Sequence, residues 1–462
     1  MPQSIRSSAL PGPRPASGLR LSELFGALSH ALDITEGQPE GHCVRCCFIG
    51  TAVGRRLGLP ESELWELYYT LLLKDLGCSS NAARICALYL TNDLTFKHDY
   101  KTIGDSLPQV LRFVLAHTGL KAGLAERFRS ILHIVQNGGE IARELIETRC
   151  HRGAEIARQL RFSEAVAAGI ESLDEHFDGR GRPTGAAGTA IPVYSRIALL
   201  AQVVDVFHTS AGREAAVAEV RRRTGTWLDP AIAAAFDAAS RAPGFWETLA
   251  SPELETTILA LEPARQASLV DEDYLDDIAA AFAGIVDSKS AWTSGHSSRV
   301  ALFADLIAEA LGFDPPARRH LRRGALLHDI GKLGVSNSIL DKPGRLDEDE
   351  WSAMRSHALL GETILSRIGA FGDLAHLAGT HHERLDGKGY PRGLTGDAIP
   401  LETRIITTAD IFDALTAERP YRGPMPVETA LAIMRGDIGT AIDADCFDAL
   451  RSALARLDET TD

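Results

Sequence analysis

The chain contains an imperfect internal duplication, and this feature constrains its fold more than any other. Residues 178–183 read DGRGRP and residues 386–391 read DGKGYP, 208 positions later. The match continues without a gap through Ile191-Pro192 and Ile399-Pro400 at the same separation. Two copies of one pattern in a chain of 462 residues predict two equivalent domains, each with its own core.

A second matching block predicts an insertion in the first copy. Gly41-His42 and Leu57-Gly58 correspond to Gly295-His296 and Leu311-Gly312, 254 positions later. Because the separation falls from 254 to 208 downstream, the first copy has extra length near residues 80–145. We therefore predict a first copy over residues 19–264 and a second over residues 265–462. Residues 1–18 are rich in Pro, Ser and Gly and are predicted to be disordered.

The apolar pattern predicts helices almost throughout. Val300, Phe303, Ile307 and Leu311 recur at steps of three and four residues, as on one face of a helix. Alternating strand patterns are scarce. The expected fold class is all-α, with two tandem helical-bundle domains.

Composition limits the classes of partner. The formal net charge of −14 argues against bulk nucleic acid, because phosphate-backbone binding needs an excess of Lys and Arg. No uncharged apolar run is long enough to span a membrane, so we expect a cytoplasmic protein without a membrane partner. The seven cysteines are an odd number in mostly apolar surroundings and are expected to be reduced.

Several histidines lie either on the apolar face of a predicted helix or at the end of one. His357 shares an apolar helix face with Met354 and Ile364, and His381-His382 follow the apolar pattern of another helix. Asp410 lies within the apolar segment 405–415, where an uncompensated carboxylate would be costly to bury. A single inward histidine is more commonly a hydrogen-bonded core residue than a metal ligand.

Taken together, these motifs resemble the HD-GYP family of bacterial phosphodiesterases. The resemblance rests on His328-Asp329, His381-His382-Glu383 and the Gly-Tyr-Pro loop, and it covers about residues 287–422. Together with the duplication, it implies two tandem HD-type domains, of which the second is catalytic. The metal ligands that it implies are His296, His328, Asp329, His357, His381, His382 and Asp410.

Five imidazoles and two carboxylates are enough to hold two metal ions, with Asp329 as a natural bridge. This mixture suits Fe, Mn or another divalent transition metal better than Mg or Ca, which favour oxygen ligands. Such a pair of ions can activate water for attack on a phosphodiester. The expected cofactors are therefore two divalent transition-metal ions, most simply Fe or Mn.

The resemblance also implies the substrate. HD-GYP enzymes open a cyclic dinucleotide, most often cyclic di-GMP, to the linear dinucleotide and sometimes onward to GMP. Asp329 and Lys332 would be the catalytic residues. Substrate contacts would come from Lys332, Asp386, Gly387, Gly389, Tyr390, Pro391, Arg419 and Arg422.

Plainer interpretations remain for some of these residues. Lys332 could cap a helix, Arg419 and Arg422 could be solvated surface charges, and the two loop glycines suit any tight turn. In addition, Trp292 stands where many family members carry a Glu associated with a third metal. We therefore expect two metals rather than three.

The first copy lacks most of the implied ligands. Its counterparts of His328, His357, His381, His382 and Asp410 are Lys74, Arg149, Leu173, Asp174 and Gln202. One hypothesis is that this copy serves packing or homodimerisation. The other is a regulatory role in which its basic residues bind a nucleotide or phosphate.

Two other functions compete with the leading hypothesis. One is a different phosphohydrolase of the wider HD superfamily, acting on a nucleotide monophosphate or on cyclic GMP-AMP. The other is a non-catalytic module that binds nucleotides or partner proteins. The full ligand set of the second copy favours an enzyme.

Overall fold

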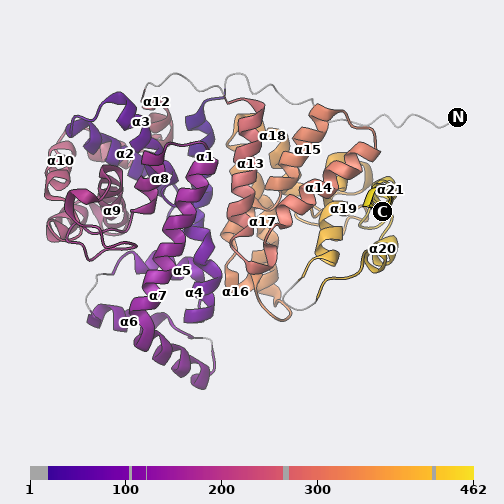
Figure 1. Cartoon of the computed structure of the whole chain (residues 1–462), viewed down its shortest axis with the longest axis horizontal. Helices are drawn as coiled ribbons and strands as arrows, with labels where there is room; N and C mark the ends of the chain where they lie inside the picture. Colours follow the sequence, from indigo (N-terminus) through magenta and orange to yellow (C-terminus); the bar gives the residue numbers. More distant parts are fainter. Residues whose placement is uncertain (1–18, 104–106, 121, 264–269, 419–422, 462) are drawn as a thin grey trace. The chain divides into compact units, whose positions relative to one another are not determined.

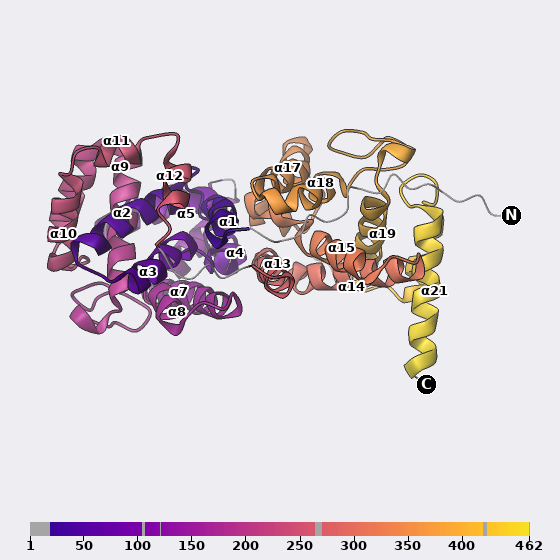
Figure 2. The same cartoon turned by 90° about the horizontal axis from the view of Figure 1, so that it is seen from above.

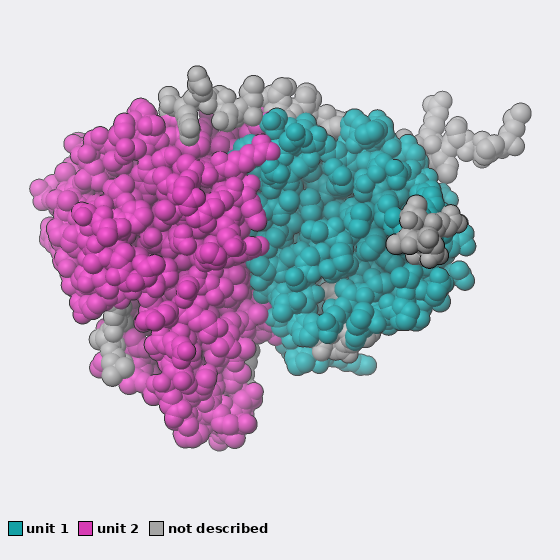
Figure 3. All heavy atoms as spheres, in the orientation of Figure 1, with its two compact units in different colours: residues 1–17, 271–335, 339–462 teal, residues 18–270, 336–338 magenta. Residues whose placement is uncertain are grey.

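The computed structural model describes residues 19–103, 107–120, 122–263, 270–418 and 423–461. These residues form two compact units (Figure 3). The C-terminal unit, unit 1 of Figure 3, holds residues 271–335 and 339–461, and the N-terminal unit, unit 2, holds residues 19–270 and 336–338. The segment predicted to be disordered and the predicted domain boundary at residues 264–265 lie outside the described residues.

Regular structure within the described ranges is helical, and the β contacts there are isolated bridges. This confirms the predicted all-α class. No helix among the residues described combines the length and the apolar character needed to cross a membrane.

The N-terminal unit begins with three helices that pack around its core (Figures 1 and 2). A short 3₁₀ turn, η1 (Cys78–Asn81), then leads to the longer helices. The helices of this unit are α1 (Leu21–Thr35), α2 (His42–Arg56), α3 (Glu61–Leu73), α4 (Ala82–Tyr89), α5 (Asp93–Tyr100), α6 (Leu107–His117), α7 (Leu124–Gln159), α8 (Glu164–Glu171), α9 (Val193–Arg223), α10 (Pro230–Ser240), α11 (Phe245–Leu249) and α12 (Leu254–Ala260).

The C-terminal unit repeats this order with fewer helices between its 3₁₀ turn and its central long helix. The 3₁₀ turn is η4 (Ile330–Gly334), and the central helix is α17. The helices are α13 (Glu272–Asp287), α14 (His296–Ala310), α15 (Pro315–Leu327), α16 (Asn337–Leu340), α17 (Glu348–Ser366), α18 (Gly372–Thr380), α19 (Leu401–Thr416), α20 (Val427–Arg435) and α21 (Ala444–Thr461). The first two residues of α16 belong to the segment 336–338 that is grouped with the N-terminal unit. Helices α13, α14 and α15 pack on one another, α14 also packs on α19, and α17 packs on α18 and η4 (Figure 2).

The segment predicted as an insertion, residues 80–145, contains α4, α5, α6 and the first part of α7. These helices surround an apolar cluster of their own. In that cluster the Phe96 ring meets the Tyr89 ring at 4.2 Å and the Phe113 ring at 5.1 Å between centroids. The other buried members are Ile85, Leu88, Val114, Ile134 and Ile141.

The two units share details that a common ancestry explains. Asp33 accepts a hydrogen bond from the backbone of Cys43, and Asp287 accepts one from the corresponding Ser297. A 3₁₀ turn also touches a long helix in both. A Cβ on Gly77 would lie 1.9 Å from the Arg149 carbonyl oxygen, and one on Gly331 would lie 1.9 Å from the His357 carbonyl oxygen. Arg149 and His357 therefore occupy equivalent positions.

This close approach makes Gly331 a sensitive position. A Gly331→Ala substitution should force η4 away from α17 and lower the free energy of unfolding by about 1–3 kcal/mol. Gly344→Ala is the matched control, because a Cβ there would meet nothing within 4 Å. Calorimetry of the two full-length variants checks this. Equal stability of the two variants would contradict the proposed close packing.

Candidate metal centre

Helix ends and the interiors of two helices bring the predicted ligands of the C-terminal unit together. His296 is the first residue of α14, and His328 and Asp329 follow the last residue of α15. His381 and His382 follow the end of α18. His357 lies within α17 and Asp410 within α19. All seven predicted metal ligands thus converge, and they form two groups, His296 with His328 and Asp410, and Asp329 with His357, His381 and His382.

Asp329 lies between these two groups. Its Oδ2 is 3.4 Å from His296 Nε2 and 3.2 Å from His328 Nε2. Its Oδ1 is 3.5 Å from His357 Nε2 and 3.7 Å from His381 Nε2. One carboxylate therefore faces a different pair of imidazoles with each oxygen.

Hydrogen bonds on the far side of the rings fix their orientation. The Nδ1 atoms of His328, His357 and His381 lie 2.6, 2.6 and 2.8 Å from the carbonyl oxygens of Ala325, Met354 and Ala378. A carbonyl oxygen only accepts, so each Nδ1 carries the proton and donates it. Each Nε2 is left with a lone pair that points into the cluster, as in a metal-ligating histidine.

His296 is oriented by a carboxylate instead of a carbonyl. Its Nδ1 donates to Asp413 Oδ2 at 2.7 Å, while Arg299 Nε donates to Asp413 Oδ1 at 2.5 Å. A carboxylate behind a ligating histidine raises the basicity of the ring and holds its tautomer.

Three buried atoms at the centre have no hydrogen-bond partner among the residues described. They are His296 Nε2, His328 Nε2 and Asp329 Oδ1. Such atoms are costly to bury unless something else satisfies them. All three point into the cluster, so these side chains fit metal ions bound on both sides of Asp329.

Burial and charge set protonation states that suit ligation. Burial lowers the pKa of His357 to about 4 and that of His382 to about 3, so both are neutral near pH 7. Burial opposes the charge of Asp329, but His328 and Lys332 hold its pKa well below the usual value. Burial would also lower the pKa of His296, but the nearby carboxylates of Asp329 and Asp413 raise it to about 9. A metal ion binding His296 would displace that proton.

Comparison with known proteins identifies the family. The model of the HD domain family matches residues 101–232 and 280–446. The chain is also 55% identical over 442 residues to the 3'3'-cGAMP-specific phosphodiesterase 3 of Vibrio cholerae, covering 96% of each chain. The chain belongs to the HD domain family. The family model thus matches the chain twice, once within each copy of the duplicated pattern.

Two further relatives extend this comparison. A crystal structure described as a cyclic GMP-AMP-specific phosphodiesterase of V. cholerae, V-cGAP3, matches with a TM-score of 0.65 and 50% identity over 95% of this chain and 98% of that one. The cyclic di-GMP phosphodiesterase response regulator RpfG of Xanthomonas campestris is 37% identical over 217 residues, 45% of this chain and 56% of its own length. These similarities confirm the HD-GYP resemblance.

The Gly-Tyr-Pro loop of the C-terminal HD domain lies against the cluster. The Tyr390 ring is 4.8 Å from the His382 ring and 6.4 Å from the His357 ring, between centroids. Behind the loop, the Glu383 carboxylate accepts from the backbone of Arg392 at 2.7 Å and of Leu394 at 2.9 Å. Tyr390 is therefore held at one wall of the site.

Other predicted substrate contacts differ in their surroundings. Lys332 Nζ donates to Asp329 Oδ2 at 2.6 Å, so its ammonium lies at the cluster. Asp386 accepts from Arg384 at 3.1 Å and from the Lys388 backbone at 3.1 Å, within its own loop. Gly387 has a φ of 74°, as the turn requires. Pro391 completes the loop. Gly389 lies so close to the neighbouring backbone that a Cβ on it would be 2.4 Å from the Arg384 nitrogen. Arg419 and Arg422 lie outside the described residues.

The N-terminal HD domain keeps the frame of this site and replaces its ligands. His42 Nδ1 pairs with Asp205 at 2.5 Å, and Arg45 also pairs with Asp205, as His296 and Arg299 do with Asp413. The Lys74 ammonium, however, lies 2.9 Å from His42 Nε2 and forms an ion pair with Asp75. A side-chain cation thus lies beside the two retained ligand residues.

A second cation is held in the same domain. Arg149, at the position of His357, forms an ion pair with Asp174, at the position of His382. Glu36 likewise pairs with Lys101 at 2.6 Å. Two small His, Cys, Asp and Glu groups remain here, His42 with Cys46 and Asp205, and Glu36 with Asp75 and Cys78. Their carboxylates already have cationic partners, so these groups are poor candidates for a metal ion.

Asp413 tests whether the orienting carboxylate matters for metal binding. Asp413→Asn should weaken metal binding by about 10–100-fold, because His296 loses its charged partner. Asp205→Asn removes the equivalent carboxylate of the N-terminal domain and should leave metal content unchanged. Chelator competition followed by metal analysis measures both variants. An effect of Asp413→Asn no larger than that of Asp205→Asn would refute this role.

Lys74 tests whether a side-chain cation has become essential to the N-terminal core. Lys74→Met should destabilise the protein by about 3–5 kcal/mol, because it leaves the buried Asp75 charge unpaired. Lys388→Met, at an exposed position, should change stability by less than about 0.5 kcal/mol. Scanning calorimetry of both full-length variants, with bound metal assayed in parallel, checks the expectation. Loss of metal in the Lys74 variant would contradict it.

Proposed function

We propose that this protein is a metal-dependent phosphodiesterase that hydrolyses a cyclic dinucleotide in its C-terminal HD domain. The observation that carries the proposal is the position of Asp329, each of whose two carboxylate oxygens faces a different pair of imidazole rings. The relatives support it, because those reported above are named as cyclic dinucleotide phosphodiesterases.

The ligand set fits two divalent transition-metal ions, with Fe or Mn favoured by the mixture of imidazole and carboxylate. His296, His328 and Asp410 would hold one ion, and His357, His381 and His382 the other, with Asp329 shared. When bound, such ions neutralise phosphate charge and make water nucleophilic near pH 7.

The chain's own residues would position the substrate. The Lys332 ammonium is 2.6 Å from Asp329 Oδ2, so a phosphate held at the cluster would lie within its reach. Tyr390 would form one wall of the site beside His382. Hydrolysis forms one bond from water oxygen to phosphorus and breaks one phosphorus–oxygen bond to a sugar, whose oxygen takes up a proton. The product of one such event is the linear dinucleotide.

We place 3'3'-cyclic GMP-AMP ahead of cyclic di-GMP as the preferred substrate. The family resemblance alone favoured cyclic di-GMP, but the relative that matches almost the whole chain is named as specific for 3'3'-cGAMP. Cyclic di-GMP remains the second candidate, since RpfG and other partial relatives are named for it.

A substrate panel separates these candidates. The full-length protein loaded anaerobically with Mn(II) or Fe(II) should convert 3'3'-cyclic GMP-AMP to a linear product faster than it converts cyclic di-GMP or cyclic di-AMP, with products resolved by chromatography. Faster cleavage of cyclic di-GMP would reverse the order of the two candidates. Absence of turnover with all three, together with less than one equivalent of bound metal, would favour a binding module.

Paired substitutions locate the chemistry. His328→Ala and Asp329→Ala should abolish turnover and reduce bound metal, because each removes a ligand of the cluster. His42→Ala, at the equivalent of His296 in the N-terminal domain, should leave turnover nearly unchanged. Initial rates and metal content measured on the three variants decide the matter. An equal loss of rate in the His42 variant would refute catalysis by the C-terminal domain alone.

A further inference from the structure

A stack of three side chains leads outward from the predicted metal ligands of the C-terminal HD domain. Tyr390 lies against His382, as described above, and the Arg355 guanidinium carbon lies 5.6 Å from the centroid of the Tyr390 ring. One helical turn earlier in α17, the Trp351 ring lies 5.5 Å from the same guanidinium. Arg355 is therefore held near two aromatic rings.

The outer members of this stack face solvent. Trp351 is 45% exposed, although a tryptophan ring normally buries most of its surface. Arg355 is also exposed, and among the residues described it forms no ion pair or hydrogen bond that would occupy its guanidinium. An exposed indole beside an unpaired guanidinium offers an apolar face and planar donors to a ligand.

The N-terminal HD domain provides an internal comparison. Features that hold the fold are kept in both copies, such as the pairs of Asp205 and Asp413 with their histidines. The stack is not kept. Trp351, Arg355 and Tyr390 correspond to Arg143, Glu147 and Arg182, so the stack is lost together with the metal ligands. This pattern associates the stack with the reaction and separates it from folding.

We propose that Trp351 and Arg355 bind a purine base of the cyclic dinucleotide, and that Arg355 selects guanine. The inference rests on the proposed function. A cyclic dinucleotide carries two bases beyond the phosphate that is cut, and one of them must lie near the rim of the site. The Trp351 ring can stack on that base. The Arg355 guanidinium, steadied by Tyr390, can donate two parallel hydrogen bonds to guanine O6 and N7, a pair that adenine does not offer.

Steady-state kinetics of the full-length, Mn(II)-loaded protein with 3'3'-cyclic GMP-AMP test this proposal. Trp351→Ala and Arg355→Ala should each raise KM about tenfold or more, while kcat changes by less than about threefold and bound metal stays constant. Trp351→Phe should restore most of the affinity, because it keeps an aromatic face. Arg355→Lys should not, because it keeps the charge and loses the planar fork.

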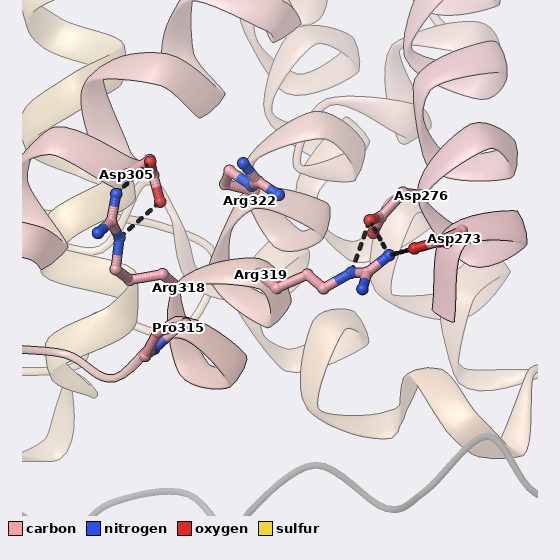
Figure 4. Close-up of a pocket in the computed structure, with 7 residues that line it drawn as sticks. All are labelled: Asp273, Asp276, Asp305, Pro315, Arg318, Arg319 and Arg322. Carbon is pink, nitrogen blue, oxygen red and sulfur yellow. Dashed lines mark hydrogen bonds and ion pairs between the residues drawn. The ribbon is translucent and has the colours of Figure 1, made fainter. Parts of the chain in front are cut away.

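Arg322 supplies the matched control. It is an exposed arginine on α15 and lines a cavity of about 580 Å³ with Arg318 and Arg319, which pair with Asp305, Asp273 and Asp276 (Figure 4). None of the predicted metal ligands lines that cavity. Arg322→Ala should therefore leave KM and kcat unchanged.

Three results would overturn the proposal. One is a KM within about twofold of wild type in both alanine variants. Another is full activity in Arg355→Lys, which would show that charge alone matters. The third is a loss of bound metal in either variant, which would show a structural role. In each case the proposed function would stand, because wild type still turns over. Failure of wild type with every cyclic dinucleotide would instead remove the proposed function, and this inference with it.

Discussion

The buried carboxylate of Asp329 is the interaction on which the C-terminal HD domain depends. Its two oxygens face imidazoles contributed by α14, α17 and the ends of α15 and α18. Without a counter-charge, one carboxylate among so many buried rings would be costly. Lys332 supplies one cation, and the unpartnered atoms around Asp329 leave room for others. Asp329 therefore contacts side chains from four helices and is also the central residue of the proposed site.

The two HD domains resolve the same electrostatic problem differently. In the C-terminal domain the buried carboxylates face imidazoles with free lone pairs. In the N-terminal domain they face the ammonium of Lys74 and the guanidinium of Arg149. These basic residues are already paired inside the protein, so they are poorly placed to bind a nucleotide or phosphate. The second hypothesis for the degenerate copy, a regulatory anion site at these residues, is weakened accordingly.

Much of the fold followed from periodicity and from comparing the chain with itself. Helical spacing predicted the all-α class. The separation of 208 residues between matching blocks identified Arg149 as the counterpart of His357, and the structure places them equivalently. The convergence of the seven predicted metal ligands also followed from the family resemblance, because all seven belong to its motif. What the sequence did not reveal is how the rings are turned. Each Nδ1 donates to the carbonyl three residues earlier in the chain, that of Ala325, Met354 or Ala378, and the apolar pattern alone does not show which ring nitrogen makes that bond.

Contacts distant in the chain were also missed, although one left a signal. Asp413 lies 117 residues from His296, but it matches Asp205, and a carboxylate kept in a degenerate copy points to a structural partner. The stack of Trp351 and Arg355 left no such signal, because exposed residues on a helix carry no apolar periodicity. The stack forms because the fold brings Arg355 of α17 against the ring of Tyr390.

Anomalous diffraction from crystals of the Mn- or Fe-loaded protein would locate the bound metal ions. We expect two anomalous peaks in each chain, one on either side of Asp329, and no peak beside Lys74 in the N-terminal domain. A single peak away from Asp329, or a peak between His42 and Asp75, would contradict this expectation.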